Sequence, residues 1–161
     1  MTQNEIISIT LDVINKNTPV ILNKLGFKEK PENLLFRICD TYDHALGMCT
    51  AFFKDQEKNE LLETVIILYP SNIIWIKILD RIWLPRLCRF SRKLFERKVL
   101  HVLAHELRHF WQYYTGEHKE YRKLSKFLPR KIRLIEIDAE KWAEEFLLVY
   151  GLQPKIANLS I

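Results

Sequence analysis

Residues 105–109 read His-Glu-Leu-Arg-His and carry the clearest chemistry in the sequence. Positions four apart lie on one face of an α-helix, so the imidazoles of His105 and His109 can bind one metal ion. Glu106 then lies beside the ion, where a general base for metal-assisted hydrolysis is needed. The alternative is a helix with two half-buried histidines that backbone groups or water satisfy. A third ligand would decide between the two.

A catalytic zinc ion normally takes three protein ligands, and the two histidines supply only two. Metzincins carry a histidine six residues after the motif, where this chain has Thr115, so that class is excluded. His118 follows three residues later, and we expect it to be a loop residue. His101 precedes His105 by one helical turn, but three histidines of one straight helix would extend over about 12 Å. We therefore expect His101 to support the ligands or the core.

The acidic segment 136–143 offers a better third ligand. If this segment is helical, Glu136 and Glu140 share a face with two alanines, which allow a close approach to the motif helix. Glu136 can then bind the metal, and Glu140 can hold a ligating imidazole through its other N–H. Asp138 is predicted to point to the opposite side. The alternative is a solvated acidic face, which is the usual environment of glutamate.

The two motifs together resemble those of gluzincin metallopeptidases such as thermolysin. Residues 136–143 read E-I-D-A-E-K-W-A, which is most similar to the E-x-x-A-x-x-F-A pattern of compact ImmA/IrrE-like bacterial and phage peptidase domains. Trp142 replaces the phenylalanine, and Glu140 stands where many relatives carry Asp or Asn. Because Glu140 is longer, it could compete with Glu136 for the metal.

The resemblance covers about residues 46–147. It implies a zincin-like minimal metalloprotease domain that hydrolyses a peptide bond in a specific protein substrate. It also implies Glu106 as catalytic base and three zinc ligands: His105, His109 and Glu136. Substrates of such enzymes commonly bind as an added strand at a sheet edge. Candidates for stabilising the oxyanion are Tyr113, Tyr114 and Tyr121, although each could equally be a packing aromatic.

Two other functions fit the same residues. A zincin-like binding or regulatory module would use zinc structurally, but such a site has no need of Glu106. A DNA-associated protease similar to SprT-like domains would use the basic segments 81–98 and 119–133 to bind nucleic acid. The net charge is +5, and more than half of the 25 Lys and Arg residues lie between residues 81 and 133. These segments could also be solvated faces.

Length and composition predict one domain, residues 1–161, with no disulfides. The three cysteines form no Cys-x-x-Cys pair, which favours reduced thiols in the cytoplasm and gives no zinc ribbon. The first residues contain no basic segment followed by an apolar one, so we expect no secretory leader. The apolar tract 64–79 is interrupted by Pro70 and Lys77, so we expect no membrane span.

Periodicity and turn residues predict an α+β fold in three parts. Residues 1–27 contain two helices, 4–16 and 19–25, with Thr18-Pro19 starting the second and Gly26 ending it. Residues 34–80 form a small antiparallel sheet. Residues 91–150 form the metal-binding helices, on which the sheet packs.

The sheet and the helices that follow it are predicted in more detail. We expect strands at 34–39 and 46–53 joined by a turn at 40–43, then a loop at 54–59, a central strand at 63–69 and a strand at 72–79 ending by Pro85. We expect the motif helix to begin at a Ser91 cap and to end at Gly116. A short basic helix follows at 119–127, then the third-ligand helix at 131–150 and a tail from Pro154.

Overall fold

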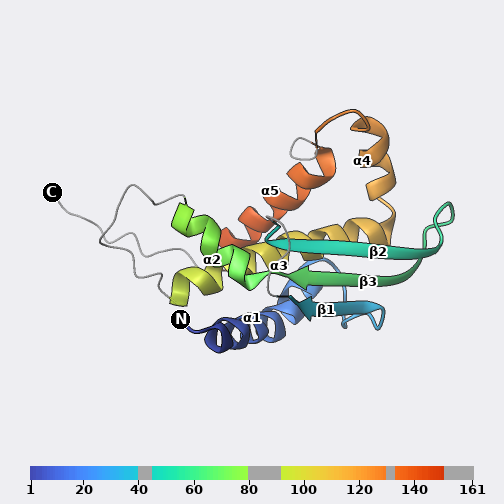
Figure 1. Cartoon of the computed structure of the whole chain (residues 1–161). Coiled ribbons are helices and arrows are strands. Elements are labelled where there is room, and N and C mark those ends of the chain that lie inside the picture. Colours follow the sequence, from blue (N-terminus) through green and yellow to red (C-terminus); the bar gives the residue numbers. More distant parts are fainter. Residues whose placement is uncertain (40–44, 80–91, 130–132, 151–161) are drawn as a thin grey trace.

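The computed structural model describes residues 1–39, 45–79, 92–129 and 133–150 (Figure 1). It has the predicted α+β composition. The helices and strands follow the order α1 (Gln3–Lys24), β1 (Leu34–Ile38), β2 (Gly47–Asp55), β3 (Glu60–Leu68), α2 (Pro70–Leu79), α3 (Arg92–Thr115), α4 (His118–Leu124) and α5 (Leu134–Val149).

The three strands form a mixed sheet of order β1-β3-β2, so the prediction of an antiparallel sheet was wrong. β1 runs parallel to β3, with Leu34 opposite Thr64, and β2 runs antiparallel to β3, with Gly47 opposite Leu68. Most residues of β3 from Thr64 to Leu68 are buried. A strand that is this buried is expected at the centre of a sheet, where neighbouring strands pair with both of its edges. The central position of β3 was predicted. β1 and β2 therefore do not pair with each other, and the predicted turn at 40–43 lies outside the described residues.

α1 is one continuous helix where the sequence predicts two. It begins with a capping box in which Thr2 and Glu5 each accept a hydrogen bond from the other's backbone N–H. Pro19 lies inside the helix and removes one backbone hydrogen bond, at a cost of about 3 kcal/mol. Buried side chains occur on both sides of this proline. Burial of both halves against one core offsets the cost, since each such side chain contributes about 1.5–3 kcal/mol. These side chains are Ile9, Val13, Ile14, Ile21 and Leu22.

Residues 70–79 form helix α2, so the strand predicted at 72–79 was wrong. Pro70 is its first residue, a position that proline favours because no N–H is needed there. The side chain of Asn72 donates a hydrogen bond to the Ala45 carbonyl (2.7 Å), and the fully buried Ile73 enters the core. α2 packs against α1 and α3, and the four isoleucines in this segment did not make a strand. Pro85 lies outside the described residues.

α3 ends at Thr115, and Gly116 follows with a φ of +82°, as the sequence predicts. The predicted cap Ser91 lies outside the described residues. α4 is shorter than the predicted helix 119–127. It begins at His118, which is 1% exposed, so the prediction of a loop residue there was wrong. Of the predicted helix 131–150, the structure describes α5; the start at 130–132, and the residues from Gly151 on, lie outside the described part.

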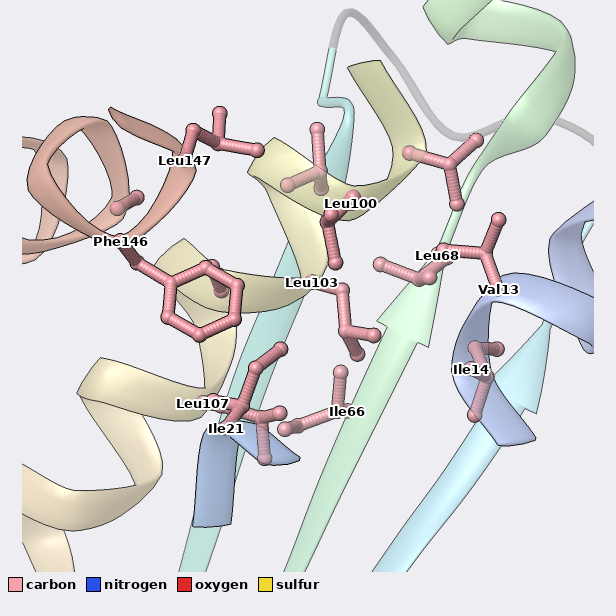
Figure 2. Packing of buried hydrophobic residues seen from close by; sticks show 14 of the residues in the cluster. Val13, Ile14, Ile21, Ile66, Leu68, Leu100, Leu103, Leu107, Phe146 and Leu147 are labelled. Atoms are coloured by element: carbon pink, nitrogen blue, oxygen red, sulfur yellow. The ribbon is translucent and has the colours of Figure 1, made fainter. Parts of the chain in front are cut away.

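α3 is the central helix of the core. Figure 1 shows α3 running along the sheet, with α1 and α5 on either side of it. Its buried Leu103 and Leu107 lie among Ile66 of β3, Ile21 of α1 and Phe146 of α5 (Figure 2). Burial of this apolar face fixes the rotation of α3, and the histidines on another face are thereby directed towards α5. Among the described residues, no helix combines the length and apolar character that crossing a bilayer requires.

Candidate metal centre

The structure brings the three predicted ligands together. His105 and His109 lie one turn apart on α3, and Glu136 lies in the first turn of α5. The two Nε2 atoms are 3.1 Å apart, and Glu136 Oε2 is 3.6 Å from that of His105 and 3.5 Å from that of His109. One ligand atom from each residue lies within 4.8 Å of the others, so this group could hold a metal ion.

The close approach of α5 to α3 depends on two alanines. Ala139 and Ala143 have no exposed surface, and α3 and α5 pack against each other. Both alanines share the helix face of Glu136, as predicted from the spacing. Small side chains let two helix backbones approach closely, and a longer carboxylate on the same face then reaches across to the other helix.

Glu140 holds the outer nitrogen of His105, as predicted. Its Oε2 lies 3.1 Å from His105 Nδ1, and its Oε1 lies 3.3 Å from His101 Nε2. A carboxylate only accepts hydrogen bonds, so His105 donates to it from Nδ1, and His101 lies within ion-pair distance of its other oxygen. His101 therefore stands behind Glu140 as a support. Glu136, and not Glu140, lies at the paired Nε2 atoms.

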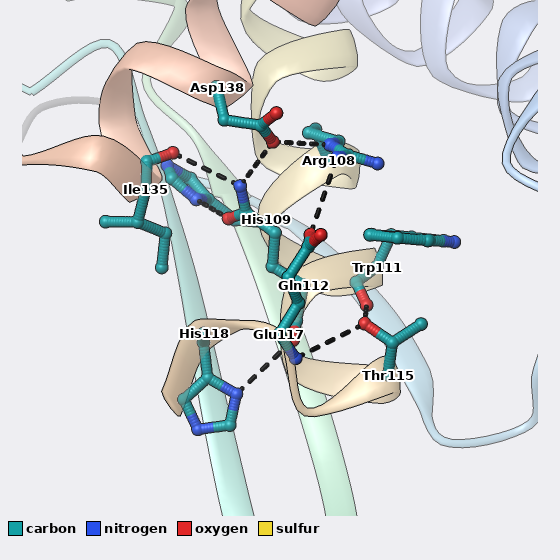
Figure 3. A network of polar contacts seen from close by, with 9 residues as sticks. All are labelled: Arg108, His109, Trp111, Gln112, Thr115, Glu117, His118, Ile135 and Asp138. Carbon is teal, nitrogen blue, oxygen red and sulfur yellow. Dashed lines mark hydrogen bonds and ion pairs between the residues drawn. The ribbon is translucent and has the colours of Figure 1, made fainter. Parts of the chain in front are cut away.

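Gln112 holds the outer nitrogen of His109 (Figure 3). Its Oε1 lies 2.8 Å from His109 Nδ1, and its Nε2 donates to the Ile135 carbonyl (3.2 Å) and to Asp138 Oδ2 (2.7 Å). Two acceptors at Nε2 fix the orientation of the amide, so Oε1 must accept from His109. Asp138 is not a member of the ligand group, but its carboxylate faces α3 and supports the group through Gln112, so the prediction that it points to the opposite side was wrong. Arg108 donates from Nε to the same Asp138 oxygen (2.7 Å).

These supports decide the tautomers of both ligands. Each imidazole keeps its hydrogen on Nδ1, so each Nε2 presents a lone pair. The two lone pairs and the Glu136 carboxylate face one another at 3.1–3.6 Å. Three electron-pair donors at that separation repel one another unless a proton or a metal cation lies between them. Two imidazole nitrogens and one carboxylate oxygen are a donor set that zinc accepts, so the residues fit the predicted zinc ion.

The electrostatic field at the centre also favours a cation. Burial lowers the pKa of His105, but the neighbouring carboxylates of Glu136, Glu106 and Glu140 outweigh that effect and raise the pKa above its ordinary value. For His101, burial is the larger influence and its pKa is lowered. Of these two imidazoles, His105, which belongs to the ligand group, is the one whose surroundings favour positive charge.

Glu106 and two of the ligands line a cavity of about 670 Å³. Glu106 is 6% exposed. Cys49 of β2 lines the same cavity, and burial, together with the charge of Glu106, raises its thiol pKa well above the usual value. Of the three tyrosines considered above, only Tyr113 lines the cavity. Burial raises its pKa, so its phenol remains a hydrogen-bond donor at neutral pH.

Tyr114 and Tyr121 do not line this cavity. Tyr114 packs on the rings of Phe27 and Phe110, with centroid separations of 4.9 and 5.8 Å. Tyr121 contributes its backbone carbonyl to the N–H of Ser125 at the end of α4. Their positions agree with a packing or surface role.

Gly47 was not anticipated from the sequence. A Cβ at this position would lie 2.6 Å from Val102 Cγ1 and 2.9 Å from Glu106 Oε1, which is closer than van der Waals contact allows. β2 therefore crosses α3 directly over Glu106. A lone glycine within a strand often marks such a close backbone approach, and this signal could have identified it.

Gln112 was also missed. It lies one turn after His109, a spacing at which an amide can reach the imidazole, so the sequence did contain a signal for it.

No protein-family model, curated protein or solved structure matches the chain.

Proposed function

We propose that the protein is a zinc-dependent peptide hydrolase that acts on a specific protein substrate. One observation carries the proposal: His105, His109 and Glu136 gather in one group, and two of them, His109 and Glu136, line a cavity that Glu106 also lines. A structural zinc site is normally closed by four protein ligands, whereas a catalytic site has three and an open position. Within the described residues the ligand group has three members, which favours the catalytic form over a binding or regulatory module.

Bound by this group, zinc would lower the pKa of a water ligand to about 7 and polarise the scissile carbonyl. Glu106 accepts the proton of the attacking water and then delivers it to the leaving amine. Contact with Gly47 limits the movement of the Glu106 carboxylate during these transfers. In this scheme, Tyr113 donates a hydrogen bond to the carbonyl oxygen as negative charge develops on it.

The substrate binds as an added strand along β2. β2 is an edge strand of the three-stranded sheet, and within the described residues no strand pairs with its outer N–H and C=O groups. Its first residue lies over Glu106, which places a paired peptide beside the proposed base. Irregular pairing with β3 begins after Phe52, so the regular part of β2 extends over residues 47–52.

The primary test replaces Glu106 by glutamine. Glu106→Gln keeps the size of the side chain but cannot accept the proton, so we expect unchanged zinc content and a loss of turnover of about 10³-fold. Turnover is measured on a peptide library by mass spectrometry. Glu145→Gln, an exposed position on α5, is the matched control and should retain activity. Full activity of Glu106→Gln would overturn the mechanism.

A second test adds a methyl group at Gly47. Gly47→Ala should push the Glu106 carboxylate aside, because its Cβ would meet Oε1 at 2.9 Å. Small displacements of a catalytic group are costly, so we expect kcat to fall by about tenfold or more. Zinc content should stay unchanged because Gly47 does not approach the ligands. Unchanged kcat would show that β2 does not position Glu106.

A further inference from the structure

A wall of positive charge closes one side of the same cavity. Its members lie on α4, just after α4 and just before α5: Arg122, Lys123, Lys126 and Arg133. Glu106, His109 and Glu136 line the same cavity. The basic wall and the proposed catalytic residues therefore share one cavity, although the sequence separates them.

The basic wall lacks acidic partners within residues 1–39, 45–79, 92–129 and 133–150. Arg133 Nε donates to the Leu128 carbonyl (3.1 Å), and Lys126 Nζ lies 5.8 Å from the centre of the Phe127 ring. By contrast, Arg108 is paired with both Asp138 and Glu117. Four basic side chains that form no ion pair with a carboxylate of the described residues are thus concentrated at the cavity.

The wall lies along the path of the proposed substrate strand. β2 begins over Glu106 and extends towards the far end of α3, where the Phe53 ring lies 6.3 Å from Tyr113 and 5.5 Å from His118, the first residue of α4. A peptide paired with β2 would pass Glu106 and then reach α4. Its side chains on one side of the scissile bond would meet the basic wall.

We propose that Arg122, Lys123, Lys126 and Arg133 select substrates with acidic side chains on one side of the scissile bond. This inference rests on the proposed function. Opposite charges in a partly enclosed cavity attract more strongly than in open water.

An acidic peptide fits this cavity better than nucleic acid does. A volume of about 670 Å³ accommodates a few side chains, whereas duplex DNA presents an extended row of phosphates that needs a long basic surface. Glu106 and Glu136, which line the same cavity, would also repel a phosphate backbone that entered it.

The test compares zinc-loaded wild type with Lys123→Gln/Lys126→Gln on a randomised peptide library. Wild type should cut sites enriched in Asp or Glu on one side only. The double variant should lose about tenfold in kcat/KM for those peptides and little for neutral ones. Both lysines are exposed, so the variant should fold. Lys16→Gln/Lys24→Gln on α1 removes the same charge away from the cavity and should behave as wild type.

A binding measurement separates this inference from the proposed function. Zinc-loaded Glu106→Gln should bind a fluorescent glutamate-rich peptide, and adding Lys123→Gln/Lys126→Gln should weaken binding about tenfold. Binding lost in this way without any cleavage by wild type would support the basic wall and overturn the hydrolase. Cleavage with no acidic preference would overturn the basic wall alone. Failure of both assays would overturn both proposals. Tighter binding of single-stranded DNA than of the peptide, lost in the same variant, would replace the acidic peptide by nucleic acid.

Discussion

The two imidazoles of the candidate metal centre donate hydrogen bonds to acceptors that differ in charge and exposure. His105 donates to Glu140, a carboxylate whose side chain is 51% exposed. His109 donates to Gln112, a neutral amide with no exposed surface. A buried carboxylate in the place of Gln112 would be costly to desolvate, whereas an amide satisfies the imidazole without adding charge.

Because of this difference in exposure and charge, Glu140 and Gln112 should affect the ligands in different ways. Water can reach Glu140 and replace its hydrogen bond, so Glu140 mainly contributes negative charge to His105. No water replaces Gln112, whose amide also joins α3 to α5 through the Ile135 carbonyl and Asp138. Gln112 should therefore contribute more to stability and metal affinity than Glu140.

The largest expected effect comes from Gln112→Ala. The change leaves His109 Nδ1–H, the Ile135 carbonyl and one bond of Asp138 without a buried partner, so we expect a loss of about 2–3 kcal/mol of unfolding free energy. Zinc affinity should fall by up to about 100-fold. Competition with a chromophoric chelator and chemical unfolding measure the two quantities. Gln56→Ala, at an exposed glutamine, is the control and should change neither quantity. If Gln112→Ala changed stability and zinc affinity no more than Gln56→Ala does, Gln112 would not be a support of His109.

Glu140→Gln should have a smaller effect. The amide oxygen still accepts from His105, and only the charge is lost, so we expect zinc affinity to fall by about tenfold or less. Because the group is exposed, the difference from wild type should shrink as ionic strength rises. The same competition assay at low and high salt tests this. A larger loss of zinc affinity in Glu140→Gln than in Gln112→Ala would show that Glu140, and not Gln112, is the more important of the two.

The smallest expected effect is a pH dependence of the unfolding free energy that arises from His118, which lies beside Gln112. His118 Nδ1 lies 3.3 Å from the backbone carbonyl oxygen of Gln112, and burial lowers the pKa of this imidazole. Its folded pKa is therefore below the unfolded value of about 6.5. The corresponding stability is present above pH 6.5 and is lost as the pH falls through the folded pKa, at up to about 1.4 kcal/mol per pH unit.

Unfolding of the zinc-free protein between pH 5 and pH 7.5 measures this loss. His105 has a raised pKa and contributes with the opposite sign, so the comparison with His118→Phe isolates His118. The variant keeps an aromatic ring beside Phe53 and Tyr113. It should lose less stability than wild type as the pH falls; equal slopes would show that His118 is not the acid-sensitive group.

Features set by local spacing were predictable from the sequence. The i, i+4 spacing of His105 and His109 and the common face of Glu136 and Glu140 follow from helix geometry alone. The end of α3 at Gly116 follows from local turn chemistry.

Features that depend on distant partners were not predictable in this way. The sheet order depends on which strand is paired along both of its edges, and the helix at 70–79 packs against α1 and α3. The continuity of α1 through Pro19 depends on the shared core. The role of Gln112 depends on Asp138, which another helix supplies. Periodicity describes one segment at a time, whereas these features arise from the packing of several segments.

The parallel pairing of β1 with β3 also affects the order of assembly. β2 and β3 are neighbours in the chain and form a hairpin, a structure that closes in about 1–10 μs. β1 is synthesised before both, yet Leu34 pairs with Thr64 at the far side of that hairpin. On the ribosome, β1 therefore emerges before its partner strand exists. Its pairing closes a long loop, so we expect it to be a late step in folding.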